Sequence, residues 1–474
     1  MRVKIRGSHD RSSTYGGIPI KLSILIPVYN GEAYLLKTLL FIDALHLDTG
    51  LEVVVVDDGS TSPIEQTVRT FERRNTQVSL KYVRIPRDQT SCRAKTRNVG
   101  AQASSGEWIT FLDNGTVIPP TFVTGLRQLL AHESIGAVFH RILGAFVNPD
   151  VHPMECISNL TPDTLPEIAD SLNNQLLWRD PRQSIGESVY HLSDLPAPWT
   201  LGWSGALTVN RGLFNQVGGF DETFSGWGGE DIDLAYRLHS VGCIFVYSSD
   251  LYALDLPHPP SDDYATKMEN NLRNLNRIHR KNYSFETEFL GCYPTMYLNQ
   301  LIGRFENLVY ESVLPAYSEE LFYYLQQKYV QDAQPSVCIG TYDERLIRRL
   351  QCSHVFVQKQ PSGLPLTKNF PNITFEYRLG RDTPYPDKYF SSIILTDMYR
   401  MLGVDILSQI VSELIRISKT VVFIFTEQFE SVVRGVDGWP WHTDSVIRNI
   451  LGTTTASQVK RIEFDDQYSL FVVE

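Results

Sequence analysis

The sequence predicts an α/β protein that contains two sheets in succession. Short apolar runs alternate with helix-like stretches from residue 22 onward, and the same alternation starts again at Ser336. Strands that alternate with helices along the chain form parallel sheets. The length of 474 residues also exceeds that of one ordinary domain, so two or three domains are expected.

In the first series, apolar runs predict strands at 22–26, 51–56, 79–85 and 108–112, with helices between them at about 32–45, 63–74 and 93–101. The continuous apolar run at 51–56 is typical of a strand buried on both faces of a parallel sheet. Polar residues follow the ends of these strands. Because ligands of open α/β sheets bind beyond the carboxyl ends of the strands, we expect the binding site at this edge.

The rest of the chain divides into segments of different character. Residues 145–200 are polar, contain several prolines and show no clear period, so we expect an insertion over the site. Residues 262–333 have a mainly helical pattern that Pro335 closes. The predicted organisation is a flexible N-terminus at 1–20, a first domain at 21–290, a helical linker at 291–334 and a second domain at 335–474.

The second domain has its own strand pattern. Strands are predicted at 337–340, 355–357, 373–377, 393–395 and 421–425, with a helix at about 405–418. The runs 459–464 and 469–473 are predicted to close this Rossmann-like sheet as an antiparallel pair.

Composition bounds the partners and the compartment. The net charge of −11 argues against nucleic acid or an anionic membrane surface as the main partner. No apolar run approaches the ~20 residues of a membrane span, and the polar N-terminus lacks the apolar core of a signal peptide. The six cysteines are scattered without a CxxC pair, which is typical of free thiols in a reducing compartment. We therefore expect a cytoplasmic protein without a transmembrane segment.

The stretch 224–233, Phe-Ser-Gly-Trp-Gly-Gly-Glu-Asp-Ile-Asp, is the main candidate for chemistry. Its glycines permit a tight turn that exposes the face of Trp227. Glu230 and Asp231 precede a helical pattern, so both are expected in the first turn of a helix, whose dipole stabilises negative charge. An aromatic face beside an ionised carboxylate suits a sugar, which has an apolar ring face and hydroxyls to deprotonate. A glycine-rich turn with an acidic helix start is the alternative without a ligand.

Residues 22–258 resemble family 2 glycosyltransferases, which have the GT-A fold. The resemblance is carried by motifs in the expected order, at 23–31, 54–60, 97–101, 111–114 and 217–221. Gly226 to Asp233 is similar to the Trp-Gly-Gly-Glu-Asp motif of β-1,4-galactosyltransferases and bacterial chondroitin-type polymerases. The resemblance implies a mixed GT-A sheet that binds a nucleotide sugar.

For the donor, the resemblance implies a UDP-sugar. The base pocket is expected to be lined by the backbone of Pro27, Tyr29 and Asn30. Asp57 or Asp58 is expected to accept the uracil imide proton, and a turn with a helix cap is the alternative role of this Asp-Asp-Gly-Ser stretch. Arg97 is expected to pair with the diphosphate or to hold Asp57, and a surface salt bridge is its alternative.

The resemblance also implies a divalent cation, Mn2+ or Mg2+, that neutralises the departing diphosphate. Asp113 is its expected ligand. The usual triplet of the family ends in a second Asp, whereas this chain has Asn114 and Gly115, so weak metal binding is expected. His258 lies where relatives have a histidine ligand, although a histidine between prolines is otherwise an ordinary loop residue.

The implied reaction is inverting, with Asp231 as the base that deprotonates an acceptor hydroxyl. Glu230, Trp227 and Gly228 are expected to hold the acceptor, which is a glycan, a lipid-linked sugar or a peptide. Asp233 is expected to stabilise the helix or the loop. Because one metal carboxylate is missing, a nucleotide-sugar-binding scaffold is the alternative.

The C-terminal segment weakly resembles class I methyltransferases, through residues 385–395 and the final strand pair. Its loop at Gly340 has one glycine where the cofactor loop of that family has several, and side chains there obstruct S-adenosylmethionine. We therefore expect a non-catalytic domain that packs against the helical segment and mediates self-association. A bifunctional glycosyl- and methyltransferase is the alternative.

Overall fold

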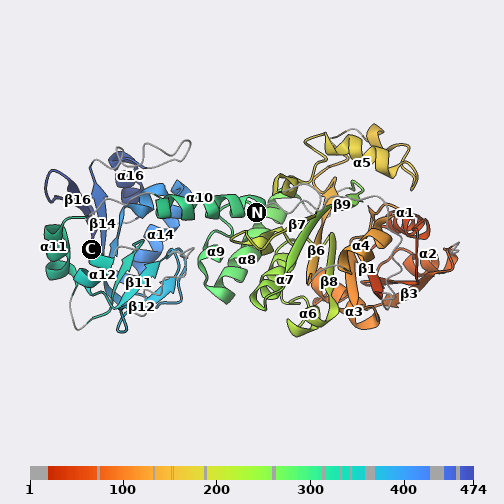
Figure 1. Cartoon of the computed structure of the whole chain (residues 1–474), viewed down its shortest axis with the longest axis horizontal. Helices are drawn as coiled ribbons and strands as arrows, with labels where there is room; N and C mark the ends of the chain where they lie inside the picture. The colour runs from red at the N-terminus through yellow and green to blue at the C-terminus, as the bar shows by residue number, and fades with distance from the viewer. Residues whose placement is uncertain are drawn as a thin grey trace. The chain divides into compact units, whose positions relative to one another are not determined.

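The computed structural model describes residues 20–474 except 72–74, 132–133, 151, 153, 186–188, 259–262, 312–316, 331–333, 342–343, 358–368, 428–441 and 455–458. The chain forms two compact units (Figure 1). The first comprises Met1–Tyr190, Ser204–Gly219 and Val246–Pro259, and the second comprises His191–Trp203, Phe220–Phe245 and Pro260–Glu474. Because this division by contacts does not follow the chain in order, the domain boundaries at 21–290, 291–334 and 335–474 stay predictions.

The first unit is built on a mixed sheet with the order β3-β2-β1-β4-β8-β6-β9-β5, and β7 pairs with β9. The strands are β1 (Leu22–Val28), β2 (Leu51–Asp57), β3 (Val78–Arg84), β4 (Trp108–Leu112), β5 (Thr116–Val117), β6 (Ala137–Leu143), β7 (Val189–His191), β8 (Ala206–Asn210) and β9 (Phe245–Asp255). Strand β1 pairs in parallel with β2 and β4, whereas β8 pairs antiparallel with β4 and β6. The predicted mixed sheet is therefore confirmed.

Helices follow the parallel strands β1, β2 and β3, as the apolar pattern predicts: α1 (Glu32–Asp43), α2 (Ile64–Thr70) and α3 (Arg93–Ala103). Three further helices, which the pattern did not predict, are α4 (Phe122–Leu130), α5 (Leu165–Asn173) and α6 (Arg211–Gln216). The valines of β2 are fully buried because this strand lies between β1 and β3 inside the sheet. The loops that follow β1, β2 and β4 hold the polar residues that the sequence singles out.

Residues 145–200, which show no clear period in sequence, nevertheless contain packed elements. Helix α5 and the short helices η1 (Glu155–Ile157), η2 (Pro181–Ile185) and η3 (Pro198–Leu201) lie in this range. Leu165, Ala169 and Leu172 are buried with Trp178, Leu143 and other apolar residues of the first unit. Their spacing places them on one face of α5, which is too short for its pattern to stand out from the surrounding polar residues.

The second unit contains a sheet with the order β12-β11-β10-β13-β14-β16-β15. Its strands are β10 (Ser336–Ile339), β11 (His354–Val357), β12 (Thr374–Tyr377), β13 (Phe390–Leu395), β14 (Ser418–Thr426), β15 (Val459–Glu463) and β16 (Tyr468–Val473). The pairs from β12 to β14 are parallel, and β16 runs antiparallel to both of its neighbours. The predicted second sheet and its final antiparallel pair are confirmed.

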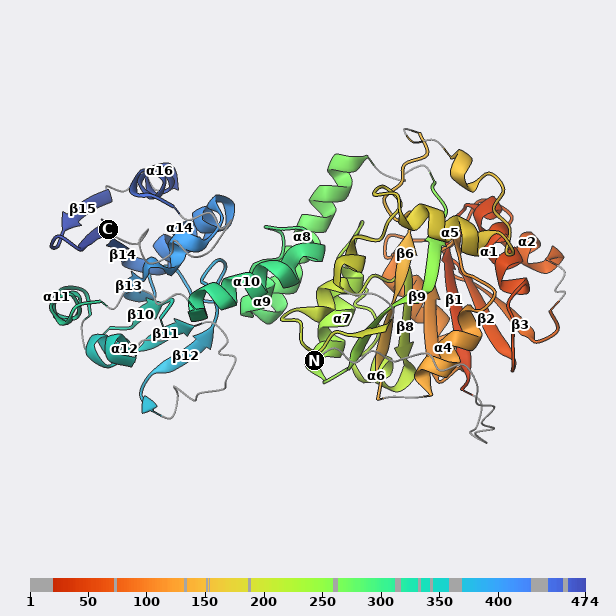
Figure 2. The same ribbon diagram turned by 45° about the horizontal axis from the view of Figure 1, so that its top comes forward.

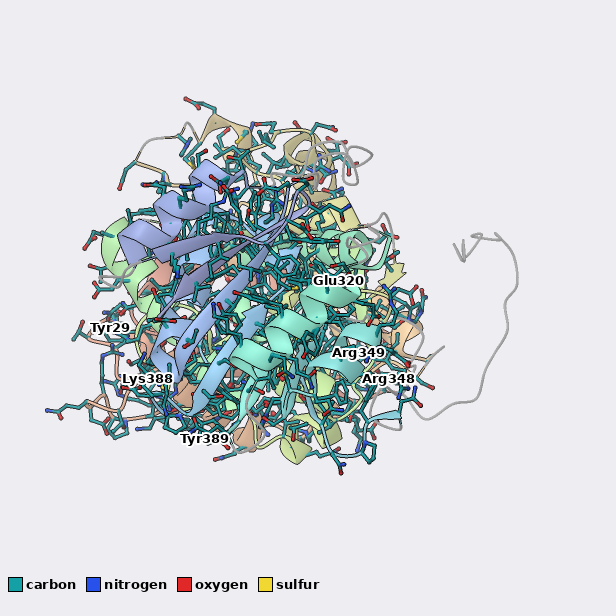
Figure 3. The ribbon with its side chains drawn as sticks, turned by 90° about the vertical axis from the view of Figure 1, so that its left-hand side faces the viewer. Tyr29, Glu320, Arg348, Arg349, Lys388 and Tyr389 are labelled. Atoms are coloured by element: carbon teal, nitrogen blue, oxygen red, sulfur yellow. The ribbon has the colours of Figure 1, made fainter. Side chains whose placement is uncertain are left out.

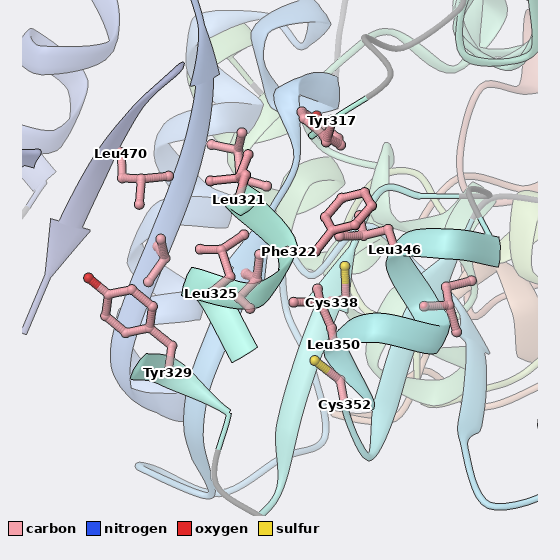
Figure 4. Close-up of a cluster of buried hydrophobic side chains, with 14 of the residues drawn as sticks. Tyr317, Leu321, Phe322, Leu325, Tyr329, Cys338, Leu346, Leu350, Cys352 and Leu470 are labelled. Carbon is pink, nitrogen blue, oxygen red and sulfur yellow. The ribbon is translucent and has the colours of Figure 1, made fainter. Parts of the chain in front are cut away.

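The helices of the second unit are α7 (Glu230–Ser240), α8 (Tyr264–Asn282), α9 (Phe285–Glu288), α10 (Leu298–Glu311), α11 (Glu319–Tyr329), α12 (Glu344–Leu350), α14 (Val404–Ile417) and α16 (Asp444–Thr454), with η4 (Thr295–Tyr297) and η5 (Asp397–Met401). A buried cluster joins α11 and α12 to the sheet through Leu321, Leu325, Leu350 and Leu470 (Figure 4). The polar side chains of Glu320, Arg348 and Arg349 lie on the outer face of these two helices (Figure 3).

Two further predictions concern the state of the cysteines and the absence of a transmembrane segment. All six cysteines are free thiols, as predicted from their spacing. Among the residues that the structure describes, no helix is both long and apolar enough to cross a bilayer.

Candidate functional site

Helix α7 begins at Glu230, so the prediction that Glu230 and Asp231 open a helix is confirmed. Gly226, Gly228 and Gly229 in the preceding turn have φ values of 76°, 87° and 90°, which side-chain-bearing residues rarely adopt. A Cβ at any of these glycines would also lie within 2.8 Å of an asparagine on α8. The glycines are therefore required both by the backbone conformation and by the close approach of a helix.

The acidic residues of this turn differ in their surroundings. Glu230 is buried, whereas Asp231 and Trp227 are partly exposed. The Oδ1 atom of Asp231 accepts the backbone N–H of Ile232 at 2.9 Å. Asp233 is buried between two cations, since its oxygens lie 2.7 Å from both Arg237 and Lys281. These contacts agree with the structural role predicted for Asp233.

In the first unit, Asn30 joins the loops that follow β1 and β2. Pro27 lies near the end of β1, and Tyr29 and Asn30 follow this strand. The side-chain oxygen of Asn30 accepts the backbone N–H of Thr61 at 3.0 Å, and its own backbone N–H donates to Ser60 Oγ at 2.7 Å. The ring of Tyr29 is about half exposed and carries the guanidinium of Arg87 at 3.6 Å from its centroid.

Asp57 is fully buried, and protein groups satisfy both of its oxygens. Oδ1 accepts the N–H of Ser60 at 2.8 Å, while Oδ2 accepts the Tyr82 hydroxyl at 2.6 Å and an Arg84 N–H at 2.8 Å. A carboxylate with this many internal donors holds the loop after β2 in place, and it has little capacity left for a ligand.

Asp58 differs from its neighbour in having an acceptor to spare. Its Oδ2 forms an ion pair with Arg87, but its buried Oδ1 has no hydrogen-bond partner among the described residues. Burial raises the pKa of Asp58, and the nearby Arg87 opposes this shift. A buried oxygen without a donor is costly unless a ligand or water supplies one.

Asp113 follows β4 and forms an ion pair with the buried Arg97 at 2.9 Å, while its own side chain is 41% exposed. Asp255, at the end of β9, was missed from the sequence. Thr116 Oγ1 donates to Asp255 Oδ1 at 3.5 Å, and burial together with the charge of Asp113 raises the pKa of Asp255 to about 7. Its only sequence signal is its position three residues before His258.

Neither residue that follows Asp113 in the triplet supplies a second carboxylate, and Asn114 has a structural role. The side-chain amide of Asn114, in the second place of the triplet, donates to the carbonyl of Gly31 at 3.2 Å and so holds the start of α1. His258 is exposed, and its ring lies edge-on to Tyr34 with centroids 5.9 Å apart. Within the described parts of the chain, no group of three or more His, Cys, Asp or Glu side chains is arranged to hold a cation.

Two family models match this part of the chain. Residues 23–179 match Glycosyl transferase family 2, and residues 188–251 match the N-terminal domain of galactosyltransferase. The match at residues 23–179 agrees with the resemblance to family 2 glycosyltransferases seen in the motifs. The Trp-Gly-Gly-Glu-Asp stretch lies within the second match, so the resemblance seen in the motifs extends through α7.

Curated relatives are also glycosyltransferases. Validoxylamine A glucosyltransferase of Streptomyces hygroscopicus subsp. jinggangensis (strain 5008) is 29% identical and aligns with 79% of this chain and 90% of its own length. The enzyme of the same name from subsp. limoneus is 33% identical over 56% of this chain and 58% of the relative. Chondroitin synthase of Escherichia coli is 29% identical over 47% of this chain, which covers 33% of that protein.

Substitution of these two neighbouring carboxylates is expected to change different properties of the protein. Asp58→Asn is expected to weaken UDP binding about tenfold, because a charged acceptor is lost, with little change in stability. Asp57→Asn is expected to lower the free energy of unfolding by about 1–2 kcal/mol, because the Arg84 and Tyr82 contacts weaken. Calorimetric titration with UDP and urea unfolding of both variants measure these effects. Equal loss of UDP affinity in the two variants would contradict the distinction.

Proposed function

We propose that this protein is an inverting glycosyltransferase that moves a sugar from a UDP-sugar to a hydroxyl of a carbohydrate-type acceptor. The observation that carries the proposal is the partly exposed Asp231 in the first turn of α7, four residues after Trp227, within the segment that matches a galactosyltransferase model. The N-terminal end of a helix keeps a carboxylate ionised, as a base requires.

The donor side of the proposal rests on Asp58. Its Oδ1, which no group in the described part of the chain contacts by a hydrogen bond, suits the imide N–H of uracil, a donor that cytosine lacks. Tyr29 and Arg87 lie beside it and offer a flat face for the base. The relatives named as glucosyltransferases make UDP-glucose the first donor to test, ahead of UDP-galactose and the N-acetylhexosamine donors.

In the proposed reaction, a carboxylate oxygen of Asp231 takes the proton of the acceptor hydroxyl while the acceptor oxygen attacks the anomeric carbon. The bond from that carbon to the diphosphate breaks on the opposite face, which inverts the configuration. Trp227 and Gly228 support the acceptor, and Glu230 orients it. Arg97 holds Asp113, and its positive charge favours the departing diphosphate.

A divalent cation, Mn2+ or Mg2+, is part of the proposal. Asp113 is partly exposed and is the main candidate ligand, with His258 as the second. One carboxylate suits a hard cation whose other ligands are substrate phosphates and water. When bound, the cation neutralises charge on the diphosphate.

The base is tested by Asp231→Asn, which keeps the shape of the side chain and removes its proton affinity. Transfer is expected to fall by ~10²–10⁴, the usual contribution of general base catalysis. UDP affinity is expected to be unchanged. Steady-state transfer from UDP-glucose and UDP titration measure the two quantities, with Asp233→Asn as the comparison that disturbs the helix contacts instead. Near wild-type transfer by Asp231→Asn would place the base elsewhere.

Metal dependence is tested with EDTA and with Asp113→Asn, which retains an oxygen for Arg97. Transfer is expected to fall about 10²-fold in Asp113→Asn, since charge on the leaving group is no longer stabilised. His258→Ala is expected to cause a smaller loss, and added Mn2+ should restore activity after EDTA. Full activity in EDTA would remove the cation from the reaction.

The C-terminal sheet is expected not to bind S-adenosylmethionine. A Cβ at Gly340 would lie 2.8 Å from the sulfur of Met398 and 2.9 Å from Thr396 Oγ1, so this glycine accommodates protein side chains. Calorimetry with S-adenosylmethionine should therefore give no heat of binding. Micromolar binding would favour the bifunctional alternative. Self-association through this domain stays a prediction.

A further inference from the structure

Helix α8 contacts two segments that are far apart in the sequence, both within the second unit. One is the turn that precedes α7, and the other is the loop 379–382 that follows β12. In Figure 2, α8 and α9 lie between α7 and the strands of the C-terminal sheet. We propose that the C-terminal sheet, acting through α8, fixes the turn Ser225–Gly229, which carries Trp227 and precedes α7. Asn274 and His279 are the positioning residues of α8. This inference rests on the proposed function.

Asn274 holds the turn from one side of the helix. Its side chain is buried, and its amide donates to the carbonyls of Ser225 at 3.1 Å and Gly228 at 2.6 Å. These two carbonyls flank Trp227, so the single amide fixes the backbone on both sides of the aromatic residue. Arg273 adds a second donor to the carbonyl of Ser225 at 3.0 Å.

Further along α8, other side chains contact the segment that carries Asp231, the proposed catalytic base. Lys281 lies 2.7 Å from both Asp221 and Asp233, and it thus joins the start of this segment to the first turn of α7. The ring of Phe224 lies beneath the cations of Arg277 and Lys281, at 5.5 and 5.4 Å from its centroid. The whole segment that carries Glu230 and Asp231 is therefore held by one helix.

On its other side, α8 is bonded to the loop that follows β12. His279 is buried, with Nε2 2.8 Å from the carbonyl of Asp382 and Nδ1 2.9 Å from Thr287 Oγ1. Burial lowers the pKa of His279 to about 4, so the ring is neutral at neutral pH and its one N–H is available for the carbonyl. Arg280 also pairs with the Asp382 carboxylate at 2.8 Å.

This loop is itself fixed by α9. The buried carboxylate of Glu288 accepts the backbone N–H groups of Leu379 and Arg381 at 2.9 and 3.1 Å. Phe285 stacks on Tyr377 at the end of β12, with centroids 4.5 Å apart. The C-terminal sheet therefore gives α8 a rigid support, and a rigid support reduces the freedom of the turn that α8 holds.

The test uses the full chain with Asn274→Asp, which turns the donor toward two carbonyls into an acceptor, and His279→Phe, which keeps a ring and removes both bonds. Glu269→Gln, at an exposed position of the same helix, is the matched control. Amide hydrogen exchange of residues 221–233 is measured first, because it reports local opening without any substrate. Both variants are expected to exchange about tenfold faster in this segment, with residues 22–60 and the Glu269→Gln control unchanged.

Steady-state kinetics then distinguish a loss of acceptor positioning from a general loss of folded structure. The kcat/KM for the acceptor is expected to fall about 10²-fold in both variants, as a small misplacement of reacting groups does. The Kd for UDP should stay within about twofold, since a change confined to this turn leaves donor contacts intact. Unchanged exchange in residues 221–233, or an equal loss of UDP affinity, overturns the inference.

Two outcomes keep the proposals apart. If exchange rises as expected but the wild-type protein transfers no sugar, the proposed function fails and the positioning role stands. If His279→Phe does not fold, Arg280→Ala removes only the exposed ion pair to Asp382. Exchange in residues 221–233 should then rise about twofold, in line with the weakness of surface pairs, and no rise overturns the inference.

Discussion

The close approach of α8 to the turn Ser225–Gly229 is the constraint on which the arrangement around Asp231 depends. Asparagine atoms of α8 occupy the space in which Cβ atoms at the three glycines would lie. The backbone can come this near only without side chains, and the approach in turn brings two carbonyls within reach of Asn274. The glycines, the buried amide and the start of α7 are therefore parts of one contact, and each requires the others.

The end of β2 carries two neighbouring carboxylates whose surroundings differ. Asp57 and Asp58 are adjacent in sequence, yet three groups satisfy Asp57, while one oxygen of Asp58 has no hydrogen-bond partner among the described residues. Asp57 is the last residue of β2 and pairs with Arg84 in the register of β3, whereas Asp58 lies beyond the end of the strand, where it contacts Arg87. The protein donors around Asp57 hold its loop in place, whereas the remaining acceptor of Asp58 can take a hydrogen bond from a ligand.

Much of this arrangement could be predicted from the sequence. The apolar runs predicted β1 to β4 of the first sheet and the strands of the second, and the glycine-tryptophan pattern predicted the start of α7, whereas β5, β6 and β7 were not predicted. The pattern could not separate Asp57 from Asp58, because the deciding donors, Tyr82 and Arg84, come from a strand whose register depends on the whole sheet. Asp255 was missed for the same reason, since its neighbour Thr116 is brought to it by an antiparallel pair. The partners of α8 likewise lie about fifty and one hundred residues away.

The two sheets end in polar residues at equivalent edges, and the difference between those edges argues for different roles. Asp397 follows β13 as Asp113 follows β4, but its oxygens are occupied by Arg400, Thr426 and the Tyr317 hydroxyl at 2.7–3.2 Å. Every one of these partners is buried, so the carboxylate is enclosed by protein. At this edge, protein groups satisfy the Asp397 carboxylate, and Met398 occupies the space beside Gly340. We therefore expect this edge to be rigid. Rigidity is what a support for α8 requires, and the loop after β12 transmits it through the carbonyl that His279 contacts.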